Sequence, residues 1–183
     1  MLFVALLPIA ISFLKPYQKA RLLTFLDPDR DPLGAGYQIT QSKIAIGSGG
    51  IFGKGYLNGS QSYLDFLPEK HTDFIFTLFS EEFGLVGSLA IVLLYAVIIQ
   101  RIVKIGNETR SSFAKLYCYG FGTAFFVYVI VNMGMVLGLL PIVGAPLPIM
   151  SYGGSSMLSI MLGLAIATVS YTHLTLPTNS NVL

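Results

Sequence analysis

Charged residues are scarce in this chain of 183 residues: only 11% are Asp, Glu, Lys or Arg, while 54% are hydrophobic. An average soluble domain carries roughly 25% charged residues, so this composition disfavours a water-solvated globule. The mean hydropathy of +0.71 indicates that a lipid bilayer is the main solvent. The net charge of +2 is too balanced to suggest a nucleic-acid partner, which a basic patch would reveal. The composition therefore predicts a membrane protein.

Cysteine and histidine are almost absent as well. The single cysteine, Cys118, cannot form an intrachain disulfide, and we expect it to be a small buried apolar residue. The two histidines, His71 and His173, form no cluster with it that has zinc-ligand spacing. The sequence therefore predicts no metal site.

Four stretches without charge predict membrane helices, because backbone exposed to lipid must satisfy its own hydrogen bonds. Residues 1–14 are too short for a full crossing, which needs about 20 residues, and they predict the second half of a helix. Full helices are predicted over residues 74–100, 116–140 and 151–168. The predicted fold class is an all-α polytopic membrane protein.

The loops between these stretches predict the orientation. The short loop 101–115 carries a clear excess of basic residues over its one acidic residue, Glu108, which predicts that it is cytoplasmic. Residues 15–73 and 141–150 are then extracytoplasmic. The glycines of the longer segment predict short interfacial helices and tight turns.

The last residues, 169–183, are set apart from the fold prediction. The run from Val169 to Thr178 resembles the translation of a sequencing-library adapter, and no charged residue occurs after Lys115. We therefore predict that this tail is not native protein.

A glycine-rich run at residues 47–55 looks superficially like a phosphate loop. Ser48 stands where the first glycine of that motif is required, and Gly55 stands where Ser or Thr would hold magnesium. The run is therefore interpreted as a place where the backbone turns. Contact between Lys54 and a lipid headgroup is the alternative.

The segment FLPEKHTDFIF, residues 66–76, brings several ionisable side chains to the start of a predicted membrane helix. One interpretation is helix capping, with Thr72 as N-cap and Asp73 in the first turn. The other places Asp73 at the rim of a membrane cavity, where partial desolvation would make it a better general base. The two interpretations are compatible.

Two further features of the predicted helices have alternatives. At least one of Glu81 and Glu82 should face protein or water, because an acidic residue in lipid costs ~2.5–3.5 kcal/mol; we expect pairing with basic residues elsewhere in the bundle. Residues 132–156 combine Asn132 with several glycines and prolines and end in SYGGSS. This pattern favours either a re-entrant loop that lines a cavity or close helix packing.

Three blocks together resemble the SEDS family of shape, elongation, division and sporulation proteins: residues 25–50, 66–76 and 132–156. Within the first block and the residues after it, the sequence is more similar to the elongation-type than to the division-type members. The resemblance implies that this chain holds the last four helices of a ten-helix bundle and a large extracytoplasmic loop. With the earlier helices absent, we expect the chain alone to be inactive.

The resemblance also implies a function, a glycosyltransferase that polymerises lipid II into peptidoglycan strands during cell elongation. It implies that Asp73 is the general base for the acceptor hydroxyl. The implied partners are lipid II, a class B penicillin-binding protein transpeptidase and the elongation machinery, in the bacterial cytoplasmic membrane. A lipid II flippase and a non-catalytic activator of the transpeptidase remain as alternatives.

The same resemblance assigns seven residues to substrate binding: Lys43, Lys54, Glu69, Lys70, His71, Ser151 and Ser155. No cofactor is assigned with certainty. Mg²⁺ or Mn²⁺ is the candidate divalent cation, although the sequence shows no ligand cluster for it.

Overall fold

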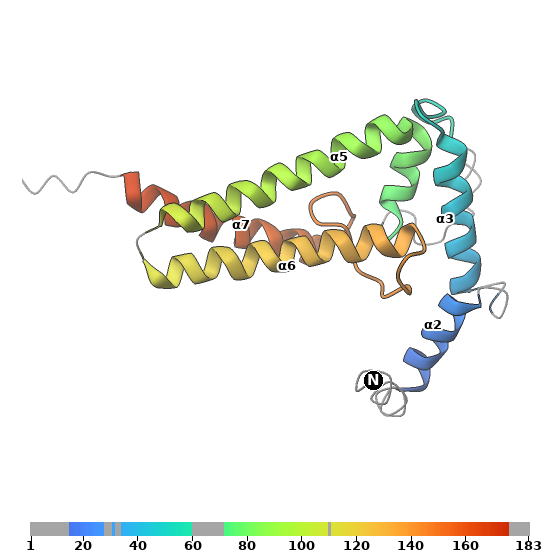
Figure 1. Cartoon of the computed structure of the whole chain (residues 1–183), viewed down its shortest axis with the longest axis horizontal. Helices are drawn as coiled ribbons and strands as arrows, with labels where there is room; N and C mark the ends of the chain where they lie inside the picture. Colours follow the sequence, from blue (N-terminus) through green and yellow to red (C-terminus); the bar gives the residue numbers. More distant parts are fainter. Residues whose placement is uncertain (1–14, 28–30, 32–33, 60–71, 110, 176–183) are drawn as a thin grey trace, which may run out of the picture.

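The computed structural model describes residues 15–27, 31, 34–59, 72–109 and 111–175. Every regular element in this part of the chain is an α-helix: α2 (Pro16–Leu26), α3 (Ala35–Gly49), α5 (Ile75–Glu108), α6 (Ser112–Val136) and α7 (Gly154–Thr175) (Figure 1). The all-α prediction is thus confirmed. The predicted partial helix over 1–14 and the predicted site residues Glu69, Lys70 and His71 lie outside the described residues.

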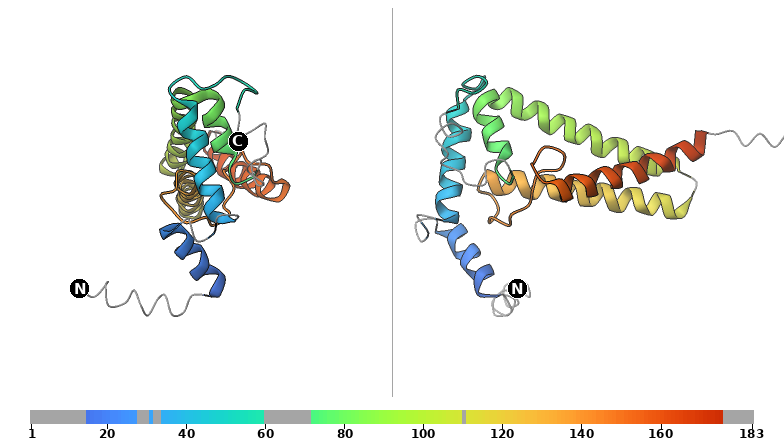
Figure 2. Two further views of the ribbon diagram at one scale, coloured as in Figure 1. Left: turned by 90° about the vertical axis from the view of Figure 1, so that its right-hand side faces the viewer. Right: turned by 180° about the vertical axis from the view of Figure 1, so that it is seen from behind.

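The long helices α5 and α6 form an antiparallel pair, and α7 packs beside both. Helix α3 crosses one end of this bundle, where it contacts both α5 and α6, and α2 leads away from it (Figures 1 and 2). The described residues of segment 15–73 thus hold two short helices, α2 and α3, in line with the short helices that its glycines predict. Asp73, Asn132 and Ser151 lie near the end of the bundle that α3 crosses.

A sharp break divides α5. Gly84 has φ 65° and ψ −160°, which lies outside the helical region, so a short first half and a long second half meet there at an angle. The first half runs beside α3, and the second half runs along α6 and α7 (Figures 1 and 2). The apolar run predicts one continuous helix over residues 74–100, so the break at Gly84 differs from the prediction.

Two helices, α5 and α6, are long and apolar enough to cross a membrane. They cover residues 75–100 and 116–136 of the spans predicted over 74–100 and 116–140. The third predicted span, 151–168, corresponds to a shorter apolar helix, Gly154–Val169, within α7. Large apolar side chains such as Leu85, Leu94 and Leu158 are exposed on these helices, as expected for surfaces that face lipid.

The helix ends differ from the predicted ones by several residues. Helix α5 continues to Glu108, with Lys104 within 3.8 Å of that residue, so most of the predicted loop 101–115 is helical. Helix α6 ends at Val136 instead of residue 140, because Gly138 adopts a φ of 69° and directs the chain out of the helix. Helix α7 reaches Thr175, which is beyond Val169, the predicted start of the non-native tail. The non-native origin of this tail stays a prediction.

The main apolar core lies where α3, the start of α5 and the end of α6 meet the connection between α6 and α7. Its buried members are Ile39, Phe74, Phe76, Tyr95, Phe125, Val129, Met135, Val136, Ile142 and Leu147. A smaller cluster at the opposite end includes Cys118, which is fully buried, as its sequence interpretation predicts. The larger core surrounds the turn that carries Asp73.

Candidate functional site

The glycine-rich segment after α3 packs directly into the break of α5. The N–H groups of Lys54 and Gly55 donate to the carbonyls of Glu81 and Glu82 at 3.1 and 3.0 Å. In the opposite direction, the N–H groups of Leu85 and Val86 donate to residues 50 and 51 at 2.9 and 3.1 Å. The break removes helical partners from these groups, and the glycine-rich segment replaces them.

Glycine is required at this contact. A Cβ atom on Gly53 would collide with the carbonyl oxygen of Glu82, and one on Gly84 would collide with the nitrogen of Gly53. Both glycines also have positive φ, at 82° and 65°, which side chains disfavour. The interpretation of this run as a backbone turn is therefore confirmed from Gly50 to Gly55, whereas residues 47–49 form the end of α3.

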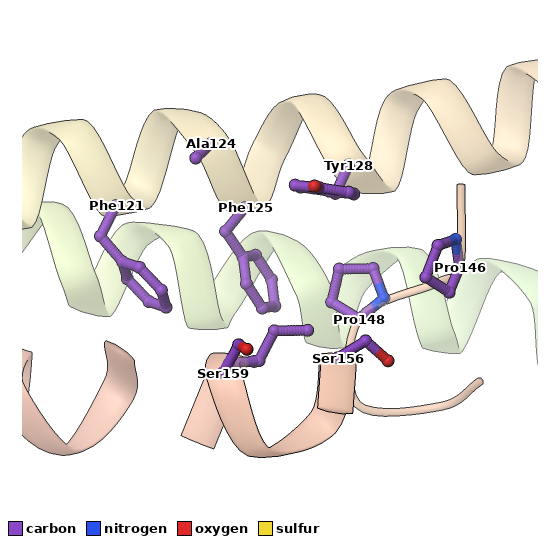
Figure 3. Close-up of a pocket in the computed structure, with 9 residues that line it drawn as sticks. Phe121, Ala124, Phe125, Tyr128, Pro146, Pro148, Ser156 and Ser159 are labelled. Carbon is purple, nitrogen blue, oxygen red and sulfur yellow. The ribbon is translucent and has the colours of Figure 1, made fainter. Parts of the chain in front are cut away.

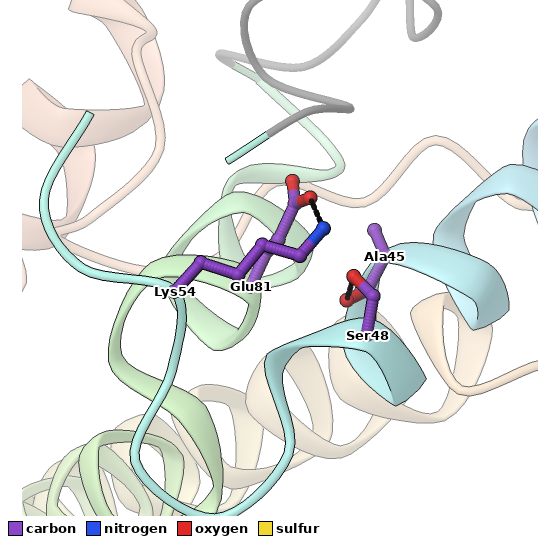
Figure 4. Close-up of polar contacts among 4 residues, drawn as sticks. All are labelled: Ala45, Ser48, Lys54 and Glu81. Atoms are coloured by element: carbon purple, nitrogen blue, oxygen red, sulfur yellow. Dashed lines mark hydrogen bonds and ion pairs between the residues drawn. The ribbon is translucent and has the colours of Figure 1, made fainter. Parts of the chain in front are cut away.

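Lys54 forms an ion pair in the same place. Its Nζ atom lies 2.7 Å from Oε1 of Glu81, whose side chain is completely buried, while 29% of the Lys54 side chain is exposed (Figure 4). The expectation that Glu81 pairs with a basic residue is confirmed. The ammonium group is thus engaged within the protein, so the geometry favours a structural role for Lys54 over the predicted substrate or headgroup contact.

The connection between α6 and α7, residues 137–153, has no helix, and side chains from three helices donate hydrogen bonds to its carbonyls. Arg21 of α2 donates to Ile142 and Val143 at 3.1 and 3.0 Å. Tyr95 of α5 donates to Pro148 at 2.5 Å. These donors satisfy irregular backbone that packs against membrane helices, as buried non-helical backbone requires.

Asn132 links this connection to the turn that holds Asp73. Its Nδ2 atom donates to the carbonyl of Asp73 at 2.8 Å and to that of Ala145 at 2.7 Å. Both partners are acceptors, so the amide must present its nitrogen to them. The sequence pattern of residues 132–156 includes Asn132 but does not predict these partners.

Ser151 holds the residue before Asp73. Its hydroxyl donates to the carbonyl of Thr72 at 2.6 Å and accepts the N–H of Leu147 at 2.7 Å, and only 5% of the residue is exposed. Both contacts are made to backbone. The structure therefore favours a positioning role for Ser151 over the predicted substrate contact.

Asp73 lies in the turn just before α5, and it is partly exposed. Gly144 of the α6–α7 connection approaches it closely, since a Cβ atom on that glycine would lie 3.4 Å from Oδ2 of Asp73. The expected N-cap at Thr72 is wrong: the helix begins at Ile75 with Phe74 as N-cap and no side-chain cap hydrogen bond. The turn is held instead by Asn132 and Ser151.

The other described site residues lie around this centre without joining it. Lys43 is exposed on α3, and its side chain lies over Gly138, next to the end of α6. Ser155 is exposed in the first turn of α7. The described contacts bring neither side chain to Asp73.

A cavity of about 300 Å³ lies between α6, α7 and the connection between them (Figure 3). Phe121, Phe125 and Tyr128 line it from α6, and Pro146 and Pro148 from the connection. Ser156 and Ser159 line it from α7, and together with Tyr128 they bring hydroxyl groups to an otherwise apolar lining. Such a lining suits an apolar group better than a phosphate.

In the described part of the chain, no three His, Cys, Asp or Glu side chains lie together as a metal site would require. These residues do not offer a fit for Mg²⁺ or Mn²⁺. The divalent cation therefore stays a prediction.

Two curated relatives are similar over most of this chain. The peptidoglycan glycosyltransferase MrdB of Escherichia coli K12 is 51% identical over 173 residues, which are 94% of this chain and 47% of MrdB. The peptidoglycan glycosyltransferase RodA of Treponema pallidum is 46% identical over 84% of this chain and 36% of its own length. The chain thus spans about half or less of the length of the relatives it matches.

Solved structures share the fold. One, described as "Structural coordination of polymerization and crosslinking by a peptidoglycan synthase complex", is 32% identical with a TM-score of 0.75, over 95% of this chain and 48% of the other. Another is an aspartate-to-alanine mutant of the rod shape determining protein RodA of Thermus thermophilus. It is 29% identical with a TM-score of 0.57, over 69% of this chain and 39% of its own.

The chain also matches a sequence model that represents a whole family. The sequence model of the FtsW, RodA and SpoVE proteins, described as cell cycle proteins, matches residues 1–174. This range contains Asp73, Asn132 and Ser151 together with every described helix, except for the last residue of α7. The chain therefore belongs to the FtsW/RodA/SpoVE family of cell cycle proteins.

Proposed function

We propose that this chain acts as part of a longer peptidoglycan glycosyltransferase that polymerises lipid II in the bacterial cytoplasmic membrane during cell elongation. Its relatives MrdB and RodA carry the name peptidoglycan glycosyltransferase and are about twice as long or more. The elongation role rests on the relative MrdB, which is 51% identical over 173 residues, whereas the matched FtsW proteins are 42–47% identical over 151–166 residues.

The observation that carries the proposal is the place of Asp73. This carboxylate lies in a turn at the end of a membrane-length helix, partly exposed, with carbonyls at Thr72 and Asp73 held by Ser151 and Asn132. A carboxylate in a fixed place at the boundary between protein core and solvent has the geometry that a general base needs.

The orientation supports use of lipid II on the outer face. Helix α6 runs from Ser112 to Asn132 over about 30 Å, at 1.5 Å per residue, which matches the hydrocarbon thickness of a bilayer. Asn132 contacts the Asp73 turn, so the basic connection before α6 and Asp73 lie at opposite membrane faces. With the basic connection in the cytoplasm, Asp73 is extracytoplasmic.

In the proposed reaction, Asp73 accepts the proton of the 4-hydroxyl of the acceptor sugar. The resulting oxygen attacks the anomeric carbon of the growing strand and forms the new glycosidic bond. The bond between that carbon and the pyrophosphate oxygen breaks, and undecaprenyl pyrophosphate leaves with the electron pair. Cations stabilise such a leaving group, and exposed Lys43 remains a candidate among the described residues.

We also propose a class B penicillin-binding protein as partner. The fold neighbour with a TM-score of 0.75 is described as part of a peptidoglycan synthase complex that couples polymerization to crosslinking. A transpeptidase is the enzyme class that crosslinks such strands. This likeness supports the proposal without identifying the surface that the partner contacts.

The test is polymerisation of purified lipid II by the full-length protein with its transpeptidase, which is blocked by penicillin so that only strand synthesis is scored. Wild type is compared with Asp73→Asn, which keeps the side-chain shape and loses its basicity. Glu108→Gln is the matched control, because it makes the same chemical change at an exposed position paired with Lys104. We expect glycan ladders from wild type and Glu108→Gln and none from Asp73→Asn.

Two results would overturn the proposal in different ways. Equal ladders from all three proteins would remove Asp73 from the reaction. Absence of ladders from all three, with the protein folded and bound to its partner, would favour transport or activation; transfer of lipid II across vesicles would then separate a flippase from an activator.

A further inference from the structure

We propose that Asn132 and Ser151 are positioning residues that set the place of the Asp73 carboxylate by holding the two carbonyls beside it. This inference rests on the proposed function, since it concerns the same reaction. It adds two residues from α6 and from the α6–α7 connection to a site that the sequence assigns to the start of α5.

One side chain donates to the peptide group before Asp73, and another donates to the peptide group after it. Ser151 donates to the carbonyl of Thr72 at 2.6 Å, and Asn132 donates to the carbonyl of Asp73 itself at 2.8 Å. The peptide groups before and after Asp73 are therefore both tied to other elements. These two contacts restrain the backbone on both sides of the Cα atom from which the Asp73 side chain extends.

Each donor is itself fixed by a second contact with the α6–α7 connection. The Nδ2 atom of Asn132 also donates to Ala145, and the hydroxyl of Ser151 also accepts from Leu147. The two side chains therefore couple the turn to one segment, in which Gly144 lies next to the carboxylate. A shift of this segment would shift the base.

Helix capping does not supply this restraint. The N-cap of α5 is Phe74, without a side-chain cap hydrogen bond, and Asp73 precedes the cap. Both donors are buried, with Asn132 at 0% and Ser151 at 5% exposure, so water competes weakly for their acceptors. Because a displacement of about 1 Å of a reacting group can cost about 100-fold in rate, loss of either donor should act on the chemical step.

The experiment measures kcat and KM for lipid II in the full-length protein with its partner for four variants. Ser151→Ala removes the hydroxyl, and Ser151→Thr keeps it. Asn132→Asp keeps the side-chain shape and replaces the donating amide by a carboxylate. Thr77→Val is the matched control, since Thr77 is fully buried near the same turn and its hydroxyl has no hydrogen-bond partner in the described structure.

We expect Ser151→Ala and Asn132→Asp to lower kcat by about 10- to 100-fold, in line with a displaced base, with KM nearly unchanged. Ser151→Thr should recover most of the rate, and Thr77→Val should match wild type. Hydrogen exchange of peptides that span residues 72–78 should be faster than wild type in the two impaired variants and no faster than wild type in the control.

The outcomes separate this inference from the proposed function. If Asp73→Asn abolishes polymerisation while Ser151→Ala keeps the wild-type kcat, the positioning role is overturned and the base remains. If Asp73→Asn polymerises normally, the proposed role of Asp73 as the base falls, and exchange at 72–78 still reports whether the two donors hold the turn. Ser151→Ala decides the question alone if Asn132→Asp does not fold.

Discussion

The Nζ atom of Lys54 lies 2.7 Å from Oε1 of Glu81, in a pair that joins the glycine-rich segment to the first half of α5. Two backbone hydrogen bonds, from Lys54 to Glu81 and from Gly55 to Glu82, run beside it. This half of α5 begins two residues after Asp73. The pair therefore stabilises the short helix that follows the proposed base, at a distance from the reaction itself.

We predict that Lys54→Met destabilises the protein by about 3 kcal/mol, because it leaves the buried carboxylate of Glu81 without its cation. Glu81→Gln should cost less, since the amide carries no charge and can still accept a hydrogen bond from Lys54. Thermal unfolding of the full-length protein in detergent measures both. Equal melting temperatures for Lys54→Met and wild type would show that Glu81 does not depend on this partner.

A second prediction concerns the glycines at the break of α5. Gly53→Ala should destabilise by more than about 1–2 kcal/mol, which is the cost of positive φ alone, because its Cβ also meets the carbonyl of Glu82. Gly47→Ala is the control: it lies exposed in α3 with open space around a Cβ. There alanine should stabilise by about 1 kcal/mol. A stabilising Gly53→Ala would contradict the described contact.

Features that depend on local composition could be predicted from the sequence, whereas features that depend on contacts between distant residues could not. The approximate spans of α5 and α6 could be predicted from runs with few charges, because a charged side chain anywhere in the hydrocarbon core is costly. The break at Gly84 could not be predicted, since a glycine inside a helical pattern is only a weak signal. What permits the break is a set of partners from residues 50–55, which only the folded chain brings there.

In the candidate site too, the sequence indicates individual residues but not the contacts between them. The residues around Asp73 indicated a site because several ionisable groups gather before an apolar helix. Asn132 was visible as an isolated polar residue in an apolar run, but its acceptor at Asp73 lies 59 residues earlier in the chain. Tyr95 and Arg21 gave no signal, because a tyrosine in a membrane helix and an arginine in a loop segment are ordinary there.

A third prediction concerns two buried hydroxyls, one without a hydrogen-bond partner in the described structure and one with such a partner. Thr77 has no hydrogen-bond partner for its Oγ1 atom in the described structure, whereas Ser42 donates to the carbonyl of Val136 at 2.7 Å. Thr77→Val should therefore stabilise, and Ser42→Ala should destabilise, each by about 1 kcal/mol. Chemical denaturation in mixed micelles compares the two. Destabilisation by Thr77→Val would reveal a partner for its hydroxyl.

The last prediction concerns how α5 restrains the connection that carries Gly144 and Ser151. The Tyr95 hydroxyl donates to the carbonyl of Pro148 at 2.5 Å, and the residue is 6% exposed. Tyr95→Phe keeps the ring in the core and leaves that carbonyl without this donor, so it should cost about 1–3 kcal/mol.

Tyr128→Phe is the matched control, because Tyr128 lies on α6 with 52% of its surface exposed, and a change there should stay within about 0.5 kcal/mol. Thermal unfolding measures the stability of both variants, and hydrogen exchange of residues 145–151 measures the connection locally. If Tyr95 restrains this segment, exchange there rises in Tyr95→Phe and is unchanged in Tyr128→Phe. Equal exchange in both would mean that Arg21, Asn132 and Ser151 suffice to hold the connection. The long half of α5 would then have no part in placing the residues beside Asp73.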